Sequence, residues 1–166
     1  MSENLVLFSH GKESGPWGTK IQRMATVARD MGASVDSIDY RGVDDPFQRA
    51  EKLLRIVDSL EVSPILIGSS MGGFISTWVA TQRDVRGVFV LAPAYNMQGY
   101  PELGIPSSPL EIVHGWHDEV VPVGQCVRFA AAAKAPLHIL DGGHRLKENS
   151  ADIALLLRSF LGKVFR

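Results

Sequence analysis

The 166-residue chain predicts an α/β fold in which a parallel sheet of about six strands carries helices on both faces. Short, fully apolar runs alternate along the chain with segments whose apolar residues recur at helical spacing. Strands that are apolar throughout are typical of a parallel sheet buried on both sides. No repeat, low-complexity segment or interdomain linker interrupts this alternation, so we expect a single domain over residues 1–166.

The first sixty residues contain two predicted strand–helix units. The apolar run at residues 5–9 is the first strand, and helical spacing follows over residues 17–31, where Gly32 ends it. Residues 34–40 are the second strand. The second helix, at residues 45–60, starts with an Asp-Pro pair, which places a cap before a proline at the first helical position.

The remaining chain repeats the same pattern with one longer connection. Four further strands are predicted at residues 63–68, 87–91, 110–114 and 136–140. Three further helices are predicted at residues 71–79, 123–134 and 150–161. The stretch from Pro93 to Pro109 is rich in Pro, Gly and Ser and too short for a large lid. We expect it to be either a loop that borders a binding site or a plain surface connection.

The composition of the chain limits the classes of partner that it is expected to bind. It is 45% hydrophobic and 21% charged, with a formal net charge of −1. This balance argues against nucleic acid or an anionic membrane as the main partner, since both attract basic surfaces. The single cysteine, Cys126, cannot form an internal disulfide and fits a reducing compartment. With no secretory signal pattern and no apolar run near the ~20 residues of a membrane span, we expect a soluble cytoplasmic protein.

A serine lies between two glycines directly after the third predicted strand. In the stretch Gly68-Ser69-Ser70-Met71-Gly72 the glycines frame Ser70 as Gly-x-Ser-x-Gly. An apolar strand that continues into this pattern and then into a helix is typical of a nucleophile elbow, which presents the serine hydroxyl above the sheet. The glycine spacing favours Ser70 over its neighbour Ser69 as the nucleophile.

Candidate acids and bases follow other predicted strands. In parallel sheets, functional groups gather at the carboxyl ends of the strands. The first strand ends at His10-Gly11-Lys12, the fifth runs into residues 114–118, and the sixth is followed by residues 141–144. The chain order Ser70, Asp118, His144 therefore brings a nucleophile, an acid and a base to one edge of the sheet.

These segments together resemble the α/β-hydrolases, in particular the small, lidless serine hydrolases of bacterial type. The resemblance covers essentially the whole chain. Its motifs are His10-Gly11, the serine elbow, His114-Gly-x-x-Asp118-x-x-Val-Pro and Gly143-His144. It implies the α/β-hydrolase fold, with strand order 2-1-3-4-5-6 and no large lid, and a reaction that needs no cofactor.

Each member of the set has a role that its chemistry suggests. His144 would take the proton of Ser70 and later protonate the leaving group, while Asp118 would orient the imidazole. The oxyanion of the tetrahedral intermediate needs two preorganised donors. Met71 is expected to supply one backbone N–H, and the resemblance implies Lys12, with Gly11 as the alternative, for the other.

Several neighbours compete for these roles. Glu119 and Asp141 are alternatives to Asp118, and His117 is an alternative to His144. The histidines expected to be structural are His10, His114 and His138. Nitrogen and carboxylate ligands suit zinc, but the cluster at residues 114–118 has no cysteine partner, so we expect no metal.

The leading hypothesis is a serine hydrolase that cleaves small carboxylic esters or thioesters through an acyl-serine intermediate. Four aromatic residues are candidates for the substrate pocket: Tyr95, Tyr100, Trp116 and Trp17. Lys12 and Arg145 flank the site and offer charge for an anionic substrate. Two alternatives are an acyltransferase that uses the same acyl-enzyme and a hydrolase-like protein whose role is partner recognition. The sequence specifies neither the natural substrate nor the oligomeric state.

Overall fold

The computed structural model describes residues 3–95, 98–99 and 101–165 and confirms the predicted fold class. Six parallel strands form one sheet in the order β2-β1-β3-β4-β5-β6. The strands are β1 Leu5–Ser9, β2 Ser34–Ile38, β3 Ile65–Ser69, β4 Gly87–Leu91, β5 Leu110–Gly115 and β6 Leu137–Leu140. The helices are α1 Thr19–Asp30, α2 Pro46–Asp58, α3 Met71–Gln82, α4 Val123–Ala133 and α5 Ser150–Val164, with a short 3-10 helix at Lys147–Asn149.

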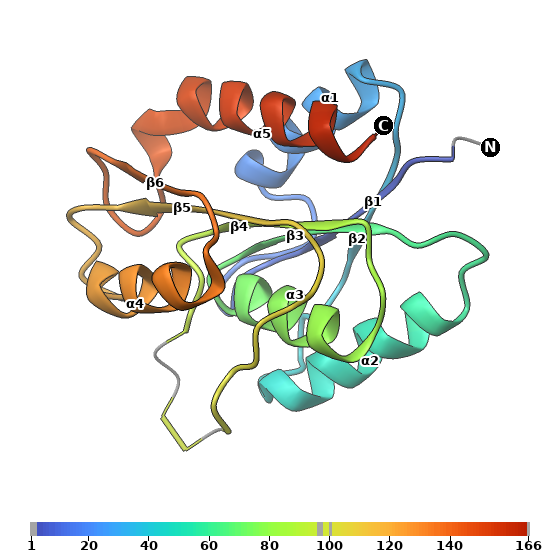
Figure 1. The fold of residues 1–166 in the computed structure, drawn as a ribbon, viewed down its shortest axis with the longest axis horizontal. Coiled ribbons are helices and arrows are strands. Elements are labelled where there is room, and N and C mark those ends of the chain that lie inside the picture. The colour runs from blue at the N-terminus through green and yellow to red at the C-terminus, as the bar shows by residue number, and fades with distance from the viewer. Residues whose placement is uncertain (1–2, 96–97, 100, 166) are drawn as a thin grey trace.

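The helices form two layers, one on each side of the sheet. Figure 1 shows α1 and α5 on one face and α2, α3 and α4 on the other. Alternate residues of each central strand enter opposite cores. In β1, Leu7 packs toward α2 and α3, while Val6 and Phe8 pack toward α1 and α5. The central strands are therefore apolar throughout because both of their faces are buried.

The register of the sheet aligns the strand ends that precede the site. Ser9 of β1 pairs with Gly68 of β3, and Gly115 of β5 pairs with Leu140 of β6. Parallel pairing in this register brings the segments after β1, β3, β5 and β6 to one edge. The order of the strands explains how groups far apart in the sequence meet there.

The second strand ends two residues earlier than the sequence predicts. After Ile38 the backbone stops pairing with β1, and the Tyr40 N–H donates instead to Nε2 of His10, at 2.9 Å. Asp39 accepts a bond from the Arg41 N–H, at 3.0 Å, which turns the chain. Two side chains thus take over backbone groups that a longer strand would have used.

No helix in the described part of the chain is both long and apolar enough to cross a membrane.

Candidate active site

Ser70 occupies a strained turn between β3 and α3. Its backbone has φ of 55° and ψ of −118°, a conformation that a residue with a side chain rarely adopts. Its N–H donates to the Leu91 carbonyl of the adjacent strand, at 2.9 Å, which holds the turn in place. A Cβ atom at Gly68 would overlap the Gly72 backbone, and one at Gly72 would overlap the Ser9 carbonyl. Both glycines are therefore required by close backbone approach, as the elbow pattern predicts.

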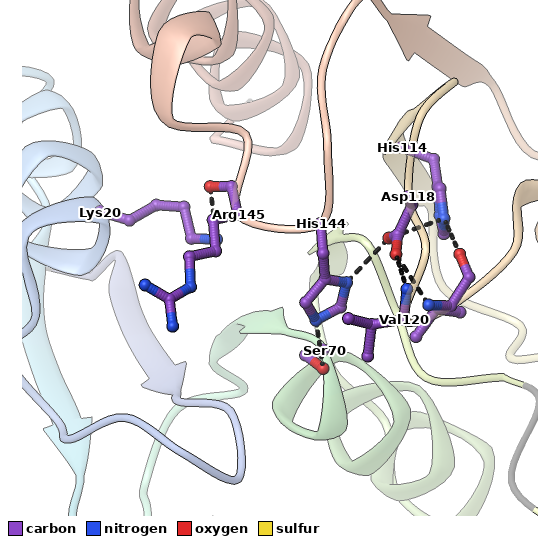
Figure 2. Close-up of polar contacts among 8 residues, drawn as sticks. Lys20, Ser70, His114, Asp118, Val120, His144 and Arg145 are labelled. Carbon is purple, nitrogen blue, oxygen red and sulfur yellow. Dashed lines mark hydrogen bonds and ion pairs between the residues drawn. The ribbon is translucent and has the colours of Figure 1, made fainter.

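His144 bridges Ser70 and Asp118. Its Nε2 lies 3.0 Å from the Ser70 Oγ, and its Nδ1 lies 2.8 Å from the Asp118 Oδ2 (Figure 2). A carboxylate only accepts, so Nδ1 carries the hydrogen and Nε2 is free to accept from the serine hydroxyl. The three predicted residues meet with the connectivity needed to move a proton from the hydroxyl to the imidazole.

The buried Asp118 carboxylate accepts three hydrogen bonds and lies close to a second histidine. The N–H groups of Val120 and Val121 donate to its Oδ1, at 2.9 and 2.7 Å. Its Oδ2 faces the His144 ring at 2.8 Å and Nε2 of His114 at 3.2 Å (Figure 2). These bonds hold the Asp118 carboxylate in one position against the His144 ring.

His114 is a buried neighbour of the acid. Its Nε2 lies 2.8 Å from the Val121 carbonyl, so this nitrogen carries a hydrogen and donates to that carbonyl, while the Asp118 Oδ2 lies 3.2 Å from the same nitrogen. Its Nδ1 has no partner among the described residues. The sequence analysis expected a structural role for His114 and did not predict its contact with Asp118.

Two backbone segments flank the Ser70 hydroxyl as possible oxyanion donors. Met71 begins α3, so its N–H lies at the positive end of the helix and has no intrahelical acceptor. Gly11 lies against the serine, since a Cβ there would be 3.5 Å from the Ser70 Cβ. Lys12 follows with an exposed side chain. Of the predicted donors, Met71 and Gly11 thus lie beside the nucleophile, and Lys12 follows Gly11 along the chain.

The competing residues lie in other contacts. His117 pairs with Asp141 at 2.7 Å, and both side chains are largely exposed. Glu119 is exposed as well. His138 contacts Glu111 at 3.2 Å, on strands β6 and β5. None of the three alternatives, His117, Asp141 and Glu119, is hydrogen-bonded to Ser70, whose hydroxyl faces His144.

The predicted aromatic lining is only partly at the surface. Trp116, directly after β5, is 60% exposed, and Trp17, before α1, is 39% exposed with the Arg29 guanidinium 5.7 Å from its ring. Tyr95 packs on Phe129, and its hydroxyl bonds to Thr77 at 2.8 Å. Tyr100 lies outside the described residues.

The structure adds Val120 to the residues beside the nucleophile. Its side chain is 65% exposed and lies next to Ser70 and His144 (Figure 2). Its position follows from its N–H bond to Asp118, which curls the loop after β5 over the imidazole. The Val-Val-Pro sequence after Asp118 could have indicated an apolar residue near the site, but it does not tell which valine faces Ser70.

A second addition is Lys20 of α1, which approaches the base from the opposite side. Its Nζ donates to the Arg145 carbonyl at 3.2 Å, next to His144 (Figure 2). Burial, together with the nearby Arg145 charge, lowers the pKa of Lys20 to about 8. Residues 20 and 145 are far apart in the sequence and share no motif, so only the folded structure reveals this contact.

The described residues contain no cluster of three or more His, Cys, Asp or Glu side chains that could hold a metal ion. Cys126 is buried in α4, and burial raises the pKa of its thiol to about 12. A thiol with that pKa is a poor nucleophile at neutral pH, because little of it is thiolate.

The sheet order, the helix layers and the serine turn define a lidless protein of the α/β serine hydrolase type. More particularly, the chain belongs to the uncharacterised protein family UPF0227, whose model matches residues 5–103. A protein from Xanthomonas campestris, assigned to the α/β superfamily of hydrolases, is 30% identical with a TM-score of 0.91. That match covers 98% of this chain and 99% of the other.

Two more distant proteins share the architecture. Mouse mitochondrial palmitoyl-protein thioesterase ABHD10 is 24% identical, over 92% of this chain and 72% of the relative. A second Xanthomonas campestris protein, described as an α/β serine hydrolase without a lid, is 16% identical with a TM-score of 0.74. That match covers 98% of this chain and 82% of the other. These similarities place the chain among hydrolases of the α/β fold.

Proposed function

We propose that this protein is a serine hydrolase that cleaves small carboxylic esters or thioesters through an acyl-Ser70 intermediate. The observation that carries the proposal is the position of His144, with one nitrogen 3.0 Å from the Ser70 hydroxyl and the other 2.8 Å from Asp118. A serine hydroxyl needs an adjacent oriented base to become nucleophilic at neutral pH. A binding module would need no such set.

The proposed reaction has two halves. Ser70 Oγ attacks the acyl carbonyl while its proton moves to His144 Nε2, and the imidazolium then protonates the departing alkoxide or thiolate. Water, deprotonated by the same nitrogen, attacks the acyl-serine and releases the acid. Both tetrahedral intermediates carry an oxyanion, which the Met71 N–H and a second N–H from the Gly11–Lys12 segment stabilise.

The substrate class follows from what surrounds the serine. Val120 offers exposed apolar surface next to it, which suits an acyl chain, and Trp116, exposed directly after β5, is a further candidate for the acyl pocket. No lid covers the site in the described part of the chain, so we expect small or short acyl groups in an open cleft. Support for thioesters comes from the similarity to mouse ABHD10, a palmitoyl-protein thioesterase. A cytoplasmic location stays a prediction that rests on the single free cysteine.

The test combines covalent labelling with turnover. The wild-type protein should react with a fluorophosphonate probe and hydrolyse p-nitrophenyl acetate, whereas Ser70→Ala should lose labelling and kcat by on the order of a millionfold. Asp118→Asn should fold normally but lower kcat by about 10⁴-fold, because the amide favours the wrong imidazole tautomer. A panel of esters and matched thioesters of increasing chain length then ranks the acyl groups.

Ser69→Ala is the matched control, since Ser69 precedes the nucleophile and belongs to β3. It should keep both labelling and turnover within a few-fold of wild type. Labelling that persists in Ser70→Ala would place the nucleophile elsewhere. A wild-type protein that is neither labelled nor active on any ester or thioester would contradict the enzyme proposal and favour partner recognition.

A further inference from the structure

Arg49 of α2 is a buried cation with an unusual set of partners. Its side chain is 1% exposed, and no carboxylate among the described residues lies within ion-pair distance of it. Its guanidinium donates instead to three backbone carbonyls, those of Val43 at 2.6 Å, Gly11 at 3.2 Å and His10 at 3.4 Å. Burying a charge is unfavourable, and an apolar side chain would pack α2 on the sheet without that cost. The carbonyls it binds therefore indicate what Arg49 does.

His10 binds the same Gly11 carbonyl from a second direction. The ring is buried, and its Nε2 accepts the Tyr40 N–H at 2.9 Å. The hydrogen of the neutral ring is therefore on Nδ1, which donates to the Gly11 oxygen at 2.7 Å. Burial lowers the pKa of His10 and favours this neutral form. Arg49 and His10 thus bind the Gly11 carbonyl from different segments, and the hydroxyl of the nearby Ser14 also donates to it, at 3.4 Å.

The orientation of one carbonyl fixes the neighbouring N–H. The described chain has no cis peptide bond, so the Lys12 N–H points opposite to the Gly11 carbonyl. That carbonyl faces Arg49 and the His10 ring, whereas Gly11 itself lies against Ser70. The Lys12 N–H is thus on the serine side and donates to no described residue.

The alternative donor, the Gly11 N–H, points elsewhere. It belongs to the peptide whose oxygen is the His10 carbonyl. That oxygen accepts from Arg49 at 3.4 Å and would lie 2.8 Å from a Cβ placed on Gly72, so it lies between Arg49 and the start of α3. The Gly11 N–H is directed away from it. Of the two candidate donors, the geometry favours Lys12.

We propose that Arg49 and His10 are positioning residues of the oxyanion hole. By binding the Gly11 carbonyl they direct the Lys12 N–H toward the oxyanion that forms on the Ser70-bound acyl group. The Arg49 charge also polarises the Gly11–Lys12 peptide, which strengthens its N–H as a donor. This inference rests on the proposed hydrolase function and assigns Arg49 a part in it that no spacing in the sequence suggests.

The experiment measures p-nitrophenyl acetate kinetics and fluorophosphonate labelling rates for Arg49→Met and Arg49→Ala. A displaced donor affects the transition state more than the bound substrate, so kcat should fall by about 10²-fold while KM stays within about twofold. The labelling rate should fall in parallel, because the phosphonyl oxygen needs the same donors. Added ethylguanidinium should restore at least about a tenth of the lost activity in Arg49→Ala, by filling the vacated cation site.

Lys52→Met is the matched control. Lys52 lies on the same helix and beside the same Tyr40 ring, at 6.0 Å, but it binds the Asp39 carbonyl. Its replacement should leave kcat and labelling within about twofold of wild type. A folded Arg49→Met protein with wild-type kcat would overturn the proposal, as would an activity loss that only tracks the unfolded fraction or that guanidinium cannot reverse.

If the Arg49 variants fail to fold, two His10 variants test whether binding of the Gly11 carbonyl positions the oxyanion donor. His10→Asn keeps a side-chain N–H for the Gly11 carbonyl, whereas His10→Ala removes it. We expect His10→Ala to lose at least about tenfold more kcat than His10→Asn, and equal activities would overturn the proposal. Failure of the hydrolase proposal would look different from failure of the positioning proposal. In that case the wild-type protein itself would show neither labelling nor turnover.

Discussion

At the scale of single residues, His10 makes the segment after β1 sensitive to pH. Its neutral ring accepts the Tyr40 N–H through Nε2 and donates to the Gly11 carbonyl through Nδ1. A protonated ring would direct two N–H groups at each other at the Tyr40 contact. Burial accordingly holds the pKa of His10 below its ordinary value of 6.5.

This lowered pKa predicts how stability depends on pH. Well above pH 6.5 the ring is neutral in both the folded and the unfolded chain, and its hydrogen bonds contribute fully to stability. As the pH falls, the unfolded chain takes up the proton first, so the free energy of unfolding decreases toward the folded-state pKa. The urea midpoint of the wild type should therefore drop more between about pH 7.5 and pH 5.5 than that of His10→Asn.

The other four histidines are present in both proteins, so the comparison isolates His10. Equal drops in the two midpoints would show that His10 titrates alike in the folded and unfolded chains.

Residues were predictable from the sequence where a strand end and a local motif coincide. Ser70, Asp118 and His144 each follow an apolar strand within a recognisable pattern, and the structure brings them together. Arg49 and Lys20 act through tertiary contacts between distant segments, and nothing near them in the sequence marks those contacts. Sequence reasoning had likewise left the second oxyanion donor open, because a peptide's orientation depends on groups 38 residues away.

At the scale of secondary-structure elements, the close approach of α3 to β1 fixes the position of Ser70 relative to the sheet. A Cβ at Gly72 would overlap the Ser9 carbonyl, which is backbone and cannot rotate away. Gly72→Ala should therefore separate helix from strand and reduce the free energy of unfolding by about 3 kcal/mol, the upper range for overpacking. Urea denaturation measures the loss.

Gly11→Ala provides the control on the neighbouring loop. A Cβ there meets its nearest atom at 3.5 Å, an ordinary contact, so the stability change should stay below about 1 kcal/mol. Comparable losses in the two variants would mean that the helix–strand spacing tolerates a methyl group.

Apolar periodicity predicted the type and approximate span of most elements, whereas their exact first and last residues depended on capping contacts. The Asp45 carboxylate accepts the Phe47 N–H at 2.9 Å, ahead of Pro46 at the start of α2, as the Asp-Pro pair predicts. The end of β2 depended on the His10 ring, 30 residues away, and so no local pattern located it.

At the scale of the whole molecule, two apolar cores share one sheet. Leu53 of α2 belongs to the core on one face and Leu157 of α5 to the core on the other, and both side chains are fully buried. The central strands contribute alternate residues to each core, so neither core can lose its packing without disturbing the sheet that supports the other. We infer that the chain unfolds as one cooperative unit, in keeping with a single domain.

Leu53→Ala and Leu157→Ala test that inference from opposite faces. Each should reduce the free energy of unfolding by about 2–5 kcal/mol, because each leaves a cavity in a close-packed core. Tryptophan fluorescence, far-UV circular dichroism and loss of esterase activity should report one coincident midpoint in the wild type, and that shared midpoint should shift in both variants. A variant that moved the midpoint of one probe alone would show that the two faces unfold independently, and the triad, which spans β3, β5 and β6, would then depend on only one of them.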